Sequence, residues 1–401
     1  MAENHQLVLV DKDLRPAYYD DFHCIMGACQ LNCCDDGWEI TFDKKDYLKV
    51  KQAPKGPELE EMMRKSLHRL RGREDADIYA EFRPDDEGRC AFHTPEGLCR
   101  LQLECSEKTL PKVCREFPRV DHYMPSGYLE RSLSPACEGV LALLWDLPEG
   151  IDFRSDPLPP ERKTRGVRPE DSRRFSEIRE WCVDVLQNRR FPLPQRIFLM
   201  GLGLRELADG ETDIGRWRER AEALAENTDL SGVLPTGERE LLMYLSNCNH
   251  IHLGIKNVIQ QTLTLRRGSE LLYSGDREAA RIMPVYREAL ARFEERFGGR
   301  EYFWENLMVT AFFHCHMPYT GSWDELWKGY VSFCNLYAFY RFVSVMSCRE
   351  GAPGDRDELF RLIVFASRKL VHNVRRQDRL RNEFFQNDSA TLAHMAILLC
   401  G

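Results

Sequence analysis

The chain has 401 residues, of which 43% are hydrophobic and 30% are charged, as is typical of a folded globular protein rather than a disordered one. The length suffices for two or three domains. The formal net charge of −8 argues against a general surface for nucleic acid. No stretch approaches the roughly 18 apolar residues of a membrane helix, and residues 1–10 lack a signal-peptide pattern. We therefore expect a cytoplasmic protein without a membrane or nucleic-acid partner.

The first 150 residues are rich in turns and poor in long apolar runs, which predicts an irregular domain with short elements. Residues 38–42 alternate between apolar and polar side chains, as in a strand. Residues 58–70 place their apolar side chains on one helical face. The elements predicted there, in chain order, are a strand at 38–42, a helix capped by Asp43 or Asp46, a helix at 58–70, a strand at 78–82 and a hairpin-like turn that presents Cys90 and Cys99.

The rest of the chain has mainly helical periodicity. Residues 151–174 contain four prolines and few apolar residues, which predicts a linker. From residue 175 onward the pattern indicates an all-α bundle. The predicted fold is therefore mainly α, with a small irregular cysteine-rich metal-binding domain with short strands at 1–150, a linker at 151–174 and a helical domain at 175–401. The helices predicted there are 176–188, 195–208, 214–226, 237–246, 277–297, 302–317, 323–345 and 357–385.

Fifteen cysteines in a cytoplasmic protein indicate metal binding or thiol chemistry, because disulfides are rare in that compartment. The pattern Cys24-x4-Cys29-x3-Cys33-Cys34 places four thiols within eleven residues. Such soft ligands suit zinc, copper(I) or iron–sulfur. Adjacent cysteines are unusual around a single zinc ion. We therefore expect one of Cys33 and Cys34 to face a different centre or to stay free.

Further along the first domain, five more cysteines are candidate ligands. With the first four they suffice for one four-iron cluster with thiols to spare, or for two four-ligand sites, and their spacing does not separate zinc from a 4Fe-4S cluster. The five are Cys90, Cys99, Cys105, Cys114 and Cys137. Six others occur singly on apolar stretches, which predicts small core residues. These six are Cys182, Cys248, Cys315, Cys334, Cys348 and Cys400.

Two motifs of S-adenosylmethionine chemistry are incomplete. Radical enzymes of this kind usually carry Cys-x3-Cys-x2-Cys, but Cys29-x3-Cys33 is followed at the third position by Asp36. Gly201-Leu202-Gly203 lies in an apolar helical stretch with no strand before it. We interpret it as close helix packing rather than as a nucleotide-binding turn.

Two histidine-containing motifs fall in the helical part. His314 and His316 would point to different faces of a helix, which favours a structural or capping role over metal binding. Arg368 and His372 are four residues apart and share a helical face, where a polar network is the favoured interpretation.

Several of these motifs together resemble the cysteine-cluster domain of flagellin lysine-N-methylases. The resemblance begins with the four-cysteine pattern and Gly37-Trp38. It continues through the segments 88–92, 97–99, 110–119 and 129–137, and less specifically through 305–307, 367–368 and 372–373 of the helical half. It thus spans nearly the whole chain.

That family is associated with S-adenosylmethionine-dependent methylation of flagellin lysines, with an iron–sulfur cluster and with eight metal-binding cysteines. The resemblance implies that the ligands here are Cys24, Cys29, Cys33, Cys34, Cys90, Cys99, Cys114 and Cys137, and that they bind a 4Fe-4S cluster or, as the alternative, zinc. The chain departs from the family at Cys105 and Ser106, so we expect Cys105 to be an idle thiol.

The function hypothesis is accordingly an S-adenosylmethionine-dependent lysine N-methylase that acts on a protein substrate such as flagellin. The alternatives are a non-catalytic iron–sulfur or zinc-binding protein and a modification enzyme for another peptide. The lysine must lose a proton before it attacks. Because the radical motif is incomplete, we expect polar methyl transfer. Aromatic faces can stabilise the charged donor, and the candidates are Trp38, Tyr47, Tyr79, Tyr123 and Tyr128.

Overall fold

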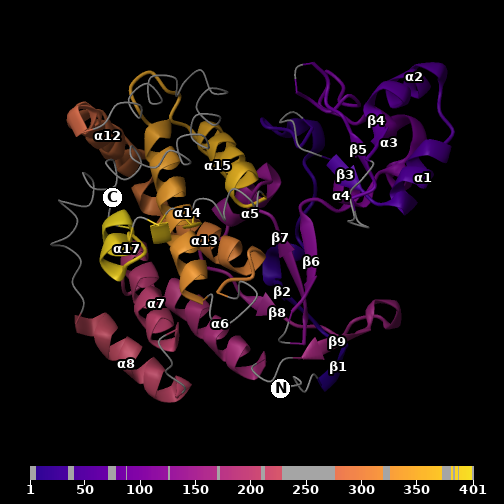
Figure 1. Ribbon diagram of the computed structural model, residues 1–401. Helices are drawn as coiled ribbons and strands as arrows, with labels where there is room; N and C mark the ends of the chain where they lie inside the picture. Colours follow the sequence, from indigo (N-terminus) through magenta and orange to yellow (C-terminus); the bar gives the residue numbers. More distant parts are fainter. Residues whose placement is uncertain are drawn as a thin grey trace.

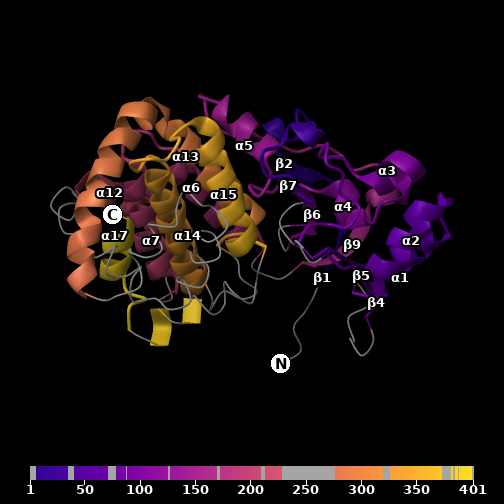
Figure 2. The same ribbon diagram turned by 90° about the horizontal axis from the view of Figure 1, so that it is seen from above.

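Two parts of the chain stand side by side in the computed structural model. In Figure 1 a large body of helices, coloured magenta to yellow, lies beside a smaller part coloured indigo and purple, and the view from above in Figure 2 agrees. We call residues 40–114 the N-terminal lobe and the helices from α5 onward the helical body. The structure describes residues 6–34, 40–70, 78–86, 88–124, 127–168, 172–208, 213–227, 276–318, 326–372, 381–382, 384–386 and 388–399.

The N-terminal lobe is built on a three-stranded antiparallel sheet in the order β3-β5-β4. Helix α1 begins where the Asp43 side chain accepts a hydrogen bond from the amide of Asp46 at 2.7 Å, which confirms Asp43 as the predicted cap. The strand predicted at 38–42 is confirmed as β3 for its described residues 40–42, and the strand predicted at 78–82 is confirmed as the shorter β5, which begins at Ala80. The elements are β3 (Ile40–Phe42), α1 (Lys44–Gln52), α2 (Pro57–Ser66), β4 (Leu67–Arg69), β5 (Ala80–Phe82), α3 (Arg100–Cys105), η3 (Glu107–Thr109) and α4 (Lys112–Glu116).

The predicted helix at 58–70 is too long, because α2 ends at Ser66. The next three residues form β4, in which Leu67 is paired with Phe82 of β5. Pairing with β5 supplies the backbone partners that another helical turn would otherwise have supplied. The core of the lobe is small and consists of Ile40, Phe42, Val50, Leu59, Met63, Ala80, Phe82, Phe92, Leu101 and Leu110.

A four-stranded sheet in the order β6-β7-β2-β8 lies between the lobe and the helical body (Figure 1). Strand β7 is antiparallel to β6, parallel to β2, and contacts helix α13 of the body. A separate two-stranded sheet joins β1 to β9. The strands are β1 (Gln6–Val10), β2 (Asp13–Pro16), β6 (Arg119–Tyr123), β7 (Leu129–Leu133), β8 (Phe153–Arg154) and β9 (Thr164–Arg168).

The segment 151–174, predicted as a linker, therefore contributes β8 and β9 to these sheets. Side chains that precede α5 in the sequence also join the core of the helical body, among them Tyr18, Phe22 and Leu133. The packing thus separates the lobe from everything else, while the division of the chain at 150 and 175 stays a prediction.

From residue 172 onward, the elements that the structure describes are helices, as predicted. Their apolar faces meet in one large core that also takes in α5. The helices are α5 (Glu138–Trp145), α6 (Ser172–Leu186), α7 (Leu193–Ala208), α8 (Ile214–Asn227), α12 (Asp276–Phe297), η6 (Gly298–Arg300), α13 (Glu301–His314), α14 (Leu326–Ser347), α15 (Arg356–Leu370) and α17 (Leu392–Leu399).

Helix α14 occupies the centre of the body, in contact with α7, α12, α15 and α17. It is buried almost all round, as is α13. A helix that is apolar on every face must be covered on every face. No helix in the described part of the chain is both long and apolar enough to cross a membrane.

The glycines of α7 confirm the interpretation of Gly201-Leu202-Gly203 as a packing motif. A Cβ atom on Gly201 would lie 2.1 Å from Cζ of Tyr330, and one on Gly203 would lie 2.6 Å from Cζ2 of Trp217. The indole nitrogen of Trp217 also donates to the carbonyl of Gly203 at 2.7 Å. Larger side chains at these positions would push α14 and α8 away from α7.

The helix predicted at 357–385 is wrong in its length. Helix α15 ends at Leu370, and residues 371–372 form a turn. The helical pattern of the sequence continues past this turn, so periodicity carries no stop signal there. Helix α17 was not predicted, and the predicted helix at 237–246 lies outside the described residues.

Candidate metal centre

The first four cysteines lie on one loop that follows β2. Cys24 accepts a hydrogen bond on its sulfur from the amide of Met26 at 3.4 Å. The short helix η2 (Met26–Ala28) then ends at Cys29. Cys33 and Cys34 come next, and the carbonyl of Cys34 accepts a hydrogen bond from the amide of Cys90 at 2.8 Å. This hydrogen bond ties the loop to the N-terminal lobe.

The other cysteines begin or occupy short helices. Cys99 and Cys137 are the residues before the first turns of α3 and α5, and Cys114 lies in α4. Cys90 forms an isolated antiparallel β-bridge with Pro84, and Cys99 forms one with His93. These two bridges make up the hairpin-like turn that was predicted to present Cys90 and Cys99.

All eight predicted ligands line a single cavity of about 600 Å³. The loop supplies four thiols, the N-terminal lobe three and the start of α5 one. Cys105 does not line this cavity; its thiol donates to the carbonyl of Pro54 at 3.1 Å. The fold thus brings the eight together from segments more than 100 residues apart, and their role as ligands stays a prediction.

The cavity is bordered on two sides by different cores. Cys90, Cys99 and Cys114 pack against the core of the N-terminal lobe. Cys137 packs against the core of the helical body. The cavity therefore lies where the lobe and the body meet.

Two buried charged side chains of the helical body hold the cysteine loop. The Glu138 carboxylate accepts hydrogen bonds from the amides of Gln30 and Leu31 at 2.8 and 3.2 Å. The guanidinium of Arg368 donates to the carbonyls of Leu31 and Asn32 at 2.9 and 3.1 Å. Both charged groups also line the cavity.

Asn32 fixes the loop on the other side. Its side-chain amide donates to the carbonyl of Gly97 at 2.8 Å, and its side-chain oxygen accepts from the amide of Cys34 at 2.9 Å. Gly97 has a φ of +77°, a conformation that favours glycine. A Cβ atom there would lie 3.0 Å from Cα of Gly27. The lobe and the loop therefore approach each other closely at this glycine.

Burial shifts the pKa of three of these thiols, and hydrogen bonds between thiols shift that of two others. Burial, the Glu138 carboxylate and neighbouring thiols raise the pKa of Cys29 to about 12. Burial raises the pKa of Cys137 to about 11 and that of Cys114 well above its usual value. Hydrogen bonds to Cys33 and Cys90 raise the pKa of Cys34, and the bond from Cys34 lowers the pKa of Cys90. Because a metal binds the thiolate, loading this site must displace several protons.

The chemistry of the thiols determines which metal groups the cavity could hold. Among the residues that the structure describes, no three histidine, cysteine, aspartate or glutamate side chains are arranged to hold one metal ion. Zinc needs four ligands around one atom, whereas the four thiolates of a 4Fe-4S cluster bind different irons and are spread around its volume. Soft thiolates are ligands of both groups, so the donor set fits either of them, and the identity of the metal stays a prediction.

Polar side chains of β7 and of Ser134, the residue that follows it, contact the motif histidines of the helical body. The Ser132 hydroxyl is hydrogen-bonded to Nδ1 of His314 at 2.9 Å, and that of Ser134 to Nε2 of His372 at 2.6 Å. Glu130, on the same strand, lies 3.7 Å from Nδ1 of His316. These contacts confirm the structural role predicted for His314 and the polar network predicted for His372.

The four proposed aromatic side chains that the structure describes do not line this cavity. Tyr47 and Tyr79 pack on each other at 5.3 Å between ring centroids beside the lobe core. Tyr123 and Tyr128 do not line the cavity either, and Trp38 lies outside the described residues. The sequence shows where the tyrosines are, but it does not show which of them pack inside the lobe and which face a cavity. The rings that do line it are Phe22, Phe82, Phe92 and Phe117.

Sequence reasoning missed Glu138 and Asn32 as groups of this site. Glu138 directly follows Cys137, and Asn32 directly precedes Cys33, so adjacency to a candidate ligand was the available signal. Arg368 was singled out only for its spacing from His372. Its contact with the loop spans more than 330 residues and has no local signal.

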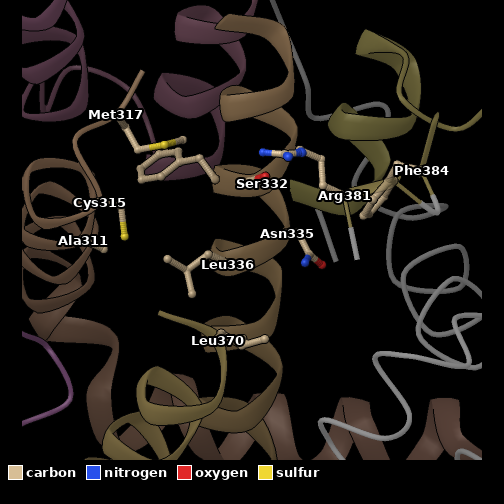
Figure 3. Close-up of a pocket in the computed structure, with 10 residues that line it drawn as sticks. Ala311, Cys315, Met317, Ser332, Asn335, Leu336, Leu370, Arg381 and Phe384 are labelled. Atoms are coloured by element: carbon tan, nitrogen blue, oxygen red, sulfur yellow. The ribbon is translucent and has the colours of Figure 1, made fainter. Parts of the chain in front are cut away.

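The remaining cysteines that the structure describes are consistent with core positions. Cys182, Cys334 and Cys348 are buried, while Cys248 and Cys400 lie outside the described residues. Cys315 borders a second cavity, of only about 50 Å³, between α13 and α14 (Figure 3). Asn335 and Arg381 lie on its other side. This space suits a few water-sized groups and not a nucleotide.

A family comparison matches the helical body. The model of the FliB lysine N-methylase C-terminal domain matches residues 179–398, which is more than half of the chain. The chain belongs to the FliB lysine N-methylase family. The match runs from α6 into α17 and includes Arg368, so the FliB-type region supplies the guanidinium that holds the cysteine loop.

Three curated relatives from Salmonella are similar to a shorter part of this FliB-family chain. The flagellar biosynthetic protein FliU of Salmonella muenchen is 30% identical over 140 residues, which is 34% of this chain and 78% of that protein. The lysine-N-methylases of Salmonella choleraesuis and Salmonella typhimurium are also 30% identical over 140 residues. Each alignment spans 33% of the lysine-N-methylase concerned. No solved structure matches the chain.

Proposed function

We propose that the protein is an S-adenosylmethionine-dependent lysine N-methylase that modifies flagellin and carries a cysteine-ligated 4Fe-4S centre. Membership of the FliB lysine N-methylase family and the names of the two Salmonella lysine-N-methylases support lysine methylation. The name of FliU, a flagellar biosynthetic protein, supports flagellin as the substrate.

One observation carries the proposal: the family-matched helices and the cysteine cavity form one site. Arg368 lies within the matched residues 179–398, is 5% exposed, and donates to two carbonyls of the cysteine loop. A buried guanidinium requires strong acceptors. The helical body and the thiols are therefore built to act together, as an enzyme with a metal centre requires.

We favour an iron–sulfur centre, with zinc as the alternative. Eight soft thiols line one cavity of about 600 Å³, and this donor set supports the proposal. The ligands of the group would come from Cys24, Cys29, Cys33, Cys34, Cys90, Cys99, Cys114 and Cys137, of which one cluster uses at most four. When bound, the cluster supplies a fixed charge and a rigid wall beside the place of reaction.

The mouth of the cavity suits a protein segment that carries lysine. Met26, Leu103 and Val113 line the cavity and yet are 60%, 63% and 38% exposed. Large exposed apolar side chains at a cavity are typical of a contact surface. The carboxylates of Glu107 and Glu138 also line it, and they complement the positive charge of a lysine.

The lysine must be neutral to attack a methyl group, although its ordinary pKa is about 10.4. Transfer from water to the phenylalanine-lined interior disfavours the ammonium and lowers the lysine pKa. An exposed carboxylate such as Glu107 at the mouth can take the released proton to solvent. Polar transfer then needs no electron donor, and it yields methyl-lysine and S-adenosylhomocysteine.

A reconstituted reaction tests this function. Protein purified without oxygen is incubated with flagellin and S-adenosylmethionine, and the small-molecule products are identified. We expect S-adenosylhomocysteine without added reductant, full activity in Cys105→Ser, and none in Cys29→Ser. If 5′-deoxyadenosine formed, or if a low-potential electron donor were essential, the polar mechanism would be wrong. If the metal-loaded protein transferred no methyl group at all, the proposed activity would be wrong.

A further inference from the structure

The cavity holds twice as many thiols as one centre uses. A structural zinc ion and a 4Fe-4S cluster each take at most four cysteines, whereas eight line this cavity. The thiol of Cys105, nearby in sequence, is engaged elsewhere with a carbonyl. Four of the eight thiols that line the cavity would therefore be left over if the cavity held only one centre.

One set of four thiols belongs to the N-terminal lobe. Cys90, Cys99 and Cys114 pack against the lobe core. Cys34 joins them, because its carbonyl accepts from the amide of Cys90 at 2.8 Å and the two thiols are hydrogen-bonded to each other. These four thiols share one side of the cavity.

The other set lies against the helical body. Cys137 packs against the body core. A Cβ atom on Gly139 would lie 3.8 Å both from Sγ of Cys137 and from the carbonyl oxygen of His23, so this sulfur lies close to the segment that carries Cys24. Cys29 interacts electrostatically with Cys24, Cys33 and Cys137.

Cys33 lies where the two sets adjoin. It interacts electrostatically with Cys29 and Cys137 on one side and with Cys99 and Cys114 on the other. Adjacent cysteines rarely bind one ion together. The Cys34 thiol is hydrogen-bonded to both Cys33 and Cys90. Because the carbonyl of Cys34 also accepts from the amide of Cys90, we assign Cys34 to the lobe set and Cys33 to the set against the body.

We propose that the cavity holds two thiolate-ligated centres. The lobe centre is bound by Cys34, Cys90, Cys99 and Cys114, and the junction centre by Cys24, Cys29, Cys33 and Cys137. This inference rests on the proposed metal-binding role of the cavity.

The two centres differ in exposure. Cys24 and Cys33 of the junction centre are exposed, whereas none of the four lobe thiols is. The junction centre also lies beside Glu138, whose carboxylate holds Gln30 and Leu31 of the cysteine loop. The lobe centre therefore stabilises the lobe, and the junction centre is the one that meets substrate and loses metal first in air.

Alkylation of the wild-type protein tests the division without any substitution. The metal-loaded protein is treated with iodoacetamide under anaerobic, non-denaturing conditions, and the modified cysteines are identified by peptide mass spectrometry. We expect all eight cavity cysteines to be protected and to react after chelation, while Cys105 reacts throughout. Brief exposure to air should first release Cys24, Cys29, Cys33 and Cys137. Reaction of four of the eight in the fully loaded protein would show a single centre and overturn the proposal.

Metal analysis gives a second, independent readout. We expect about eight irons per chain in the wild type, and about half of that in both Cys29→Ser and Cys99→Ser. The double variant should hold almost none, and Cys105→Ser should match the wild type. Electron paramagnetic resonance of the two single variants should give two different signals. About four irons in the wild type, with one variant unaffected, would contradict two centres.

The outcomes also separate this inference from the proposed function. Methyl transfer by a protein with one centre would overturn only the division of the thiols. Two centres in a protein that transfers no methyl group would leave the division standing and overturn the enzymatic function.

Discussion

Arg368 is the residue through which the helical body acts on the cysteine loop. Its guanidinium donates to the carbonyls of Leu31, Asn32 and Ala136 at 2.9, 3.1 and 3.4 Å. A shorter or neutral side chain would leave these buried acceptors without their donor, which costs free energy. The position therefore tolerates little change.

Replacement of Arg368 by alanine should lower the free energy of unfolding by about 3 kcal/mol, because hydrogen bonds from a charged group are lost inside the protein. Urea denaturation of the metal-loaded protein measures the change. Arg356→Ala is the matched control on the same helix, since Arg356 is 54% exposed and should contribute less than about 0.5 kcal/mol. Equal decreases in the free energy of unfolding in the two variants would show that the hydrogen bonds from Arg368 to the cysteine loop do not stabilise the protein.

His314 makes stability depend on pH. Burial, and then the neighbouring His372, His316 and His122, hold the pKa of His314 well below its usual value. The unfolded histidine, with a pKa of about 6.5, binds a proton at a higher pH than the folded one. The contribution of neutral His314 to the stability of the folded protein is therefore complete above about pH 6.5 and is lost as the pH falls.

The His314→Gln variant should consequently lose less stability than the wild type between pH 7 and pH 5. The melting temperature, recorded across that range for both proteins, measures the difference. The same slope in both proteins would mean that His314 is not the group that takes up the proton.

At the scale of elements, helix α3 contributes the most exposed apolar side chain of the cavity mouth. Leu103 is 63% exposed, and burying a leucine contributes about 2 kcal/mol. Leu103→Asp should therefore raise the KM for flagellin by about thirtyfold and leave kcat and metal content unchanged. Leu48→Asp is the control, because Leu48 on α1 is 40% exposed and does not line the cavity. An equal change of the KM in both variants would show that flagellin does not bind at the mouth of the cavity.

The sequence was sufficient for elements with a local signal. The cap at Asp43, the strands β3 and β5 and most helices of the body follow from periodicity and capping residues. Strand β4 could not be predicted, because Leu67 leaves the helical pattern only when Phe82 of β5 is available as a partner. The end of α15 could not be predicted either, because the helical periodicity of the sequence continues past Leu370 without a stop signal.

At the scale of the whole molecule, the eight thiols could be chosen from the sequence, but their surroundings could not. The cysteines stand out by number and by resemblance to a family. Glu138 and Arg368, by contrast, meet the loop only after the lobe and the helical body have packed against each other. Such contacts between distant segments leave no pattern in a single sequence.

Removal of the metal should unfold the N-terminal lobe and not the helical body. The lobe has a core of only ten buried side chains and strands of three residues, so its folding depends on bound metal. Circular dichroism should show that most helical signal survives chelation, while hydrogen exchange should become fast in residues 40–114. Residues 133–145 should stay protected, because they share the core of the body. A lobe that stayed protected without metal would be a self-sufficient domain.

The central claim is that this protein adds methyl groups to lysines of flagellin at the cysteine-lined cavity. The most direct measurement is the peptide mass map of flagellin produced together with this protein in a host that has no such methylase. We expect lysine-containing peptides heavier by about 14 mass units per methyl group with the wild type and with Cys105→Ser, and unmodified peptides with Cys29→Ser. Unmodified lysines beside the metal-loaded wild type, or full methylation beside Cys29→Ser, would contradict the account.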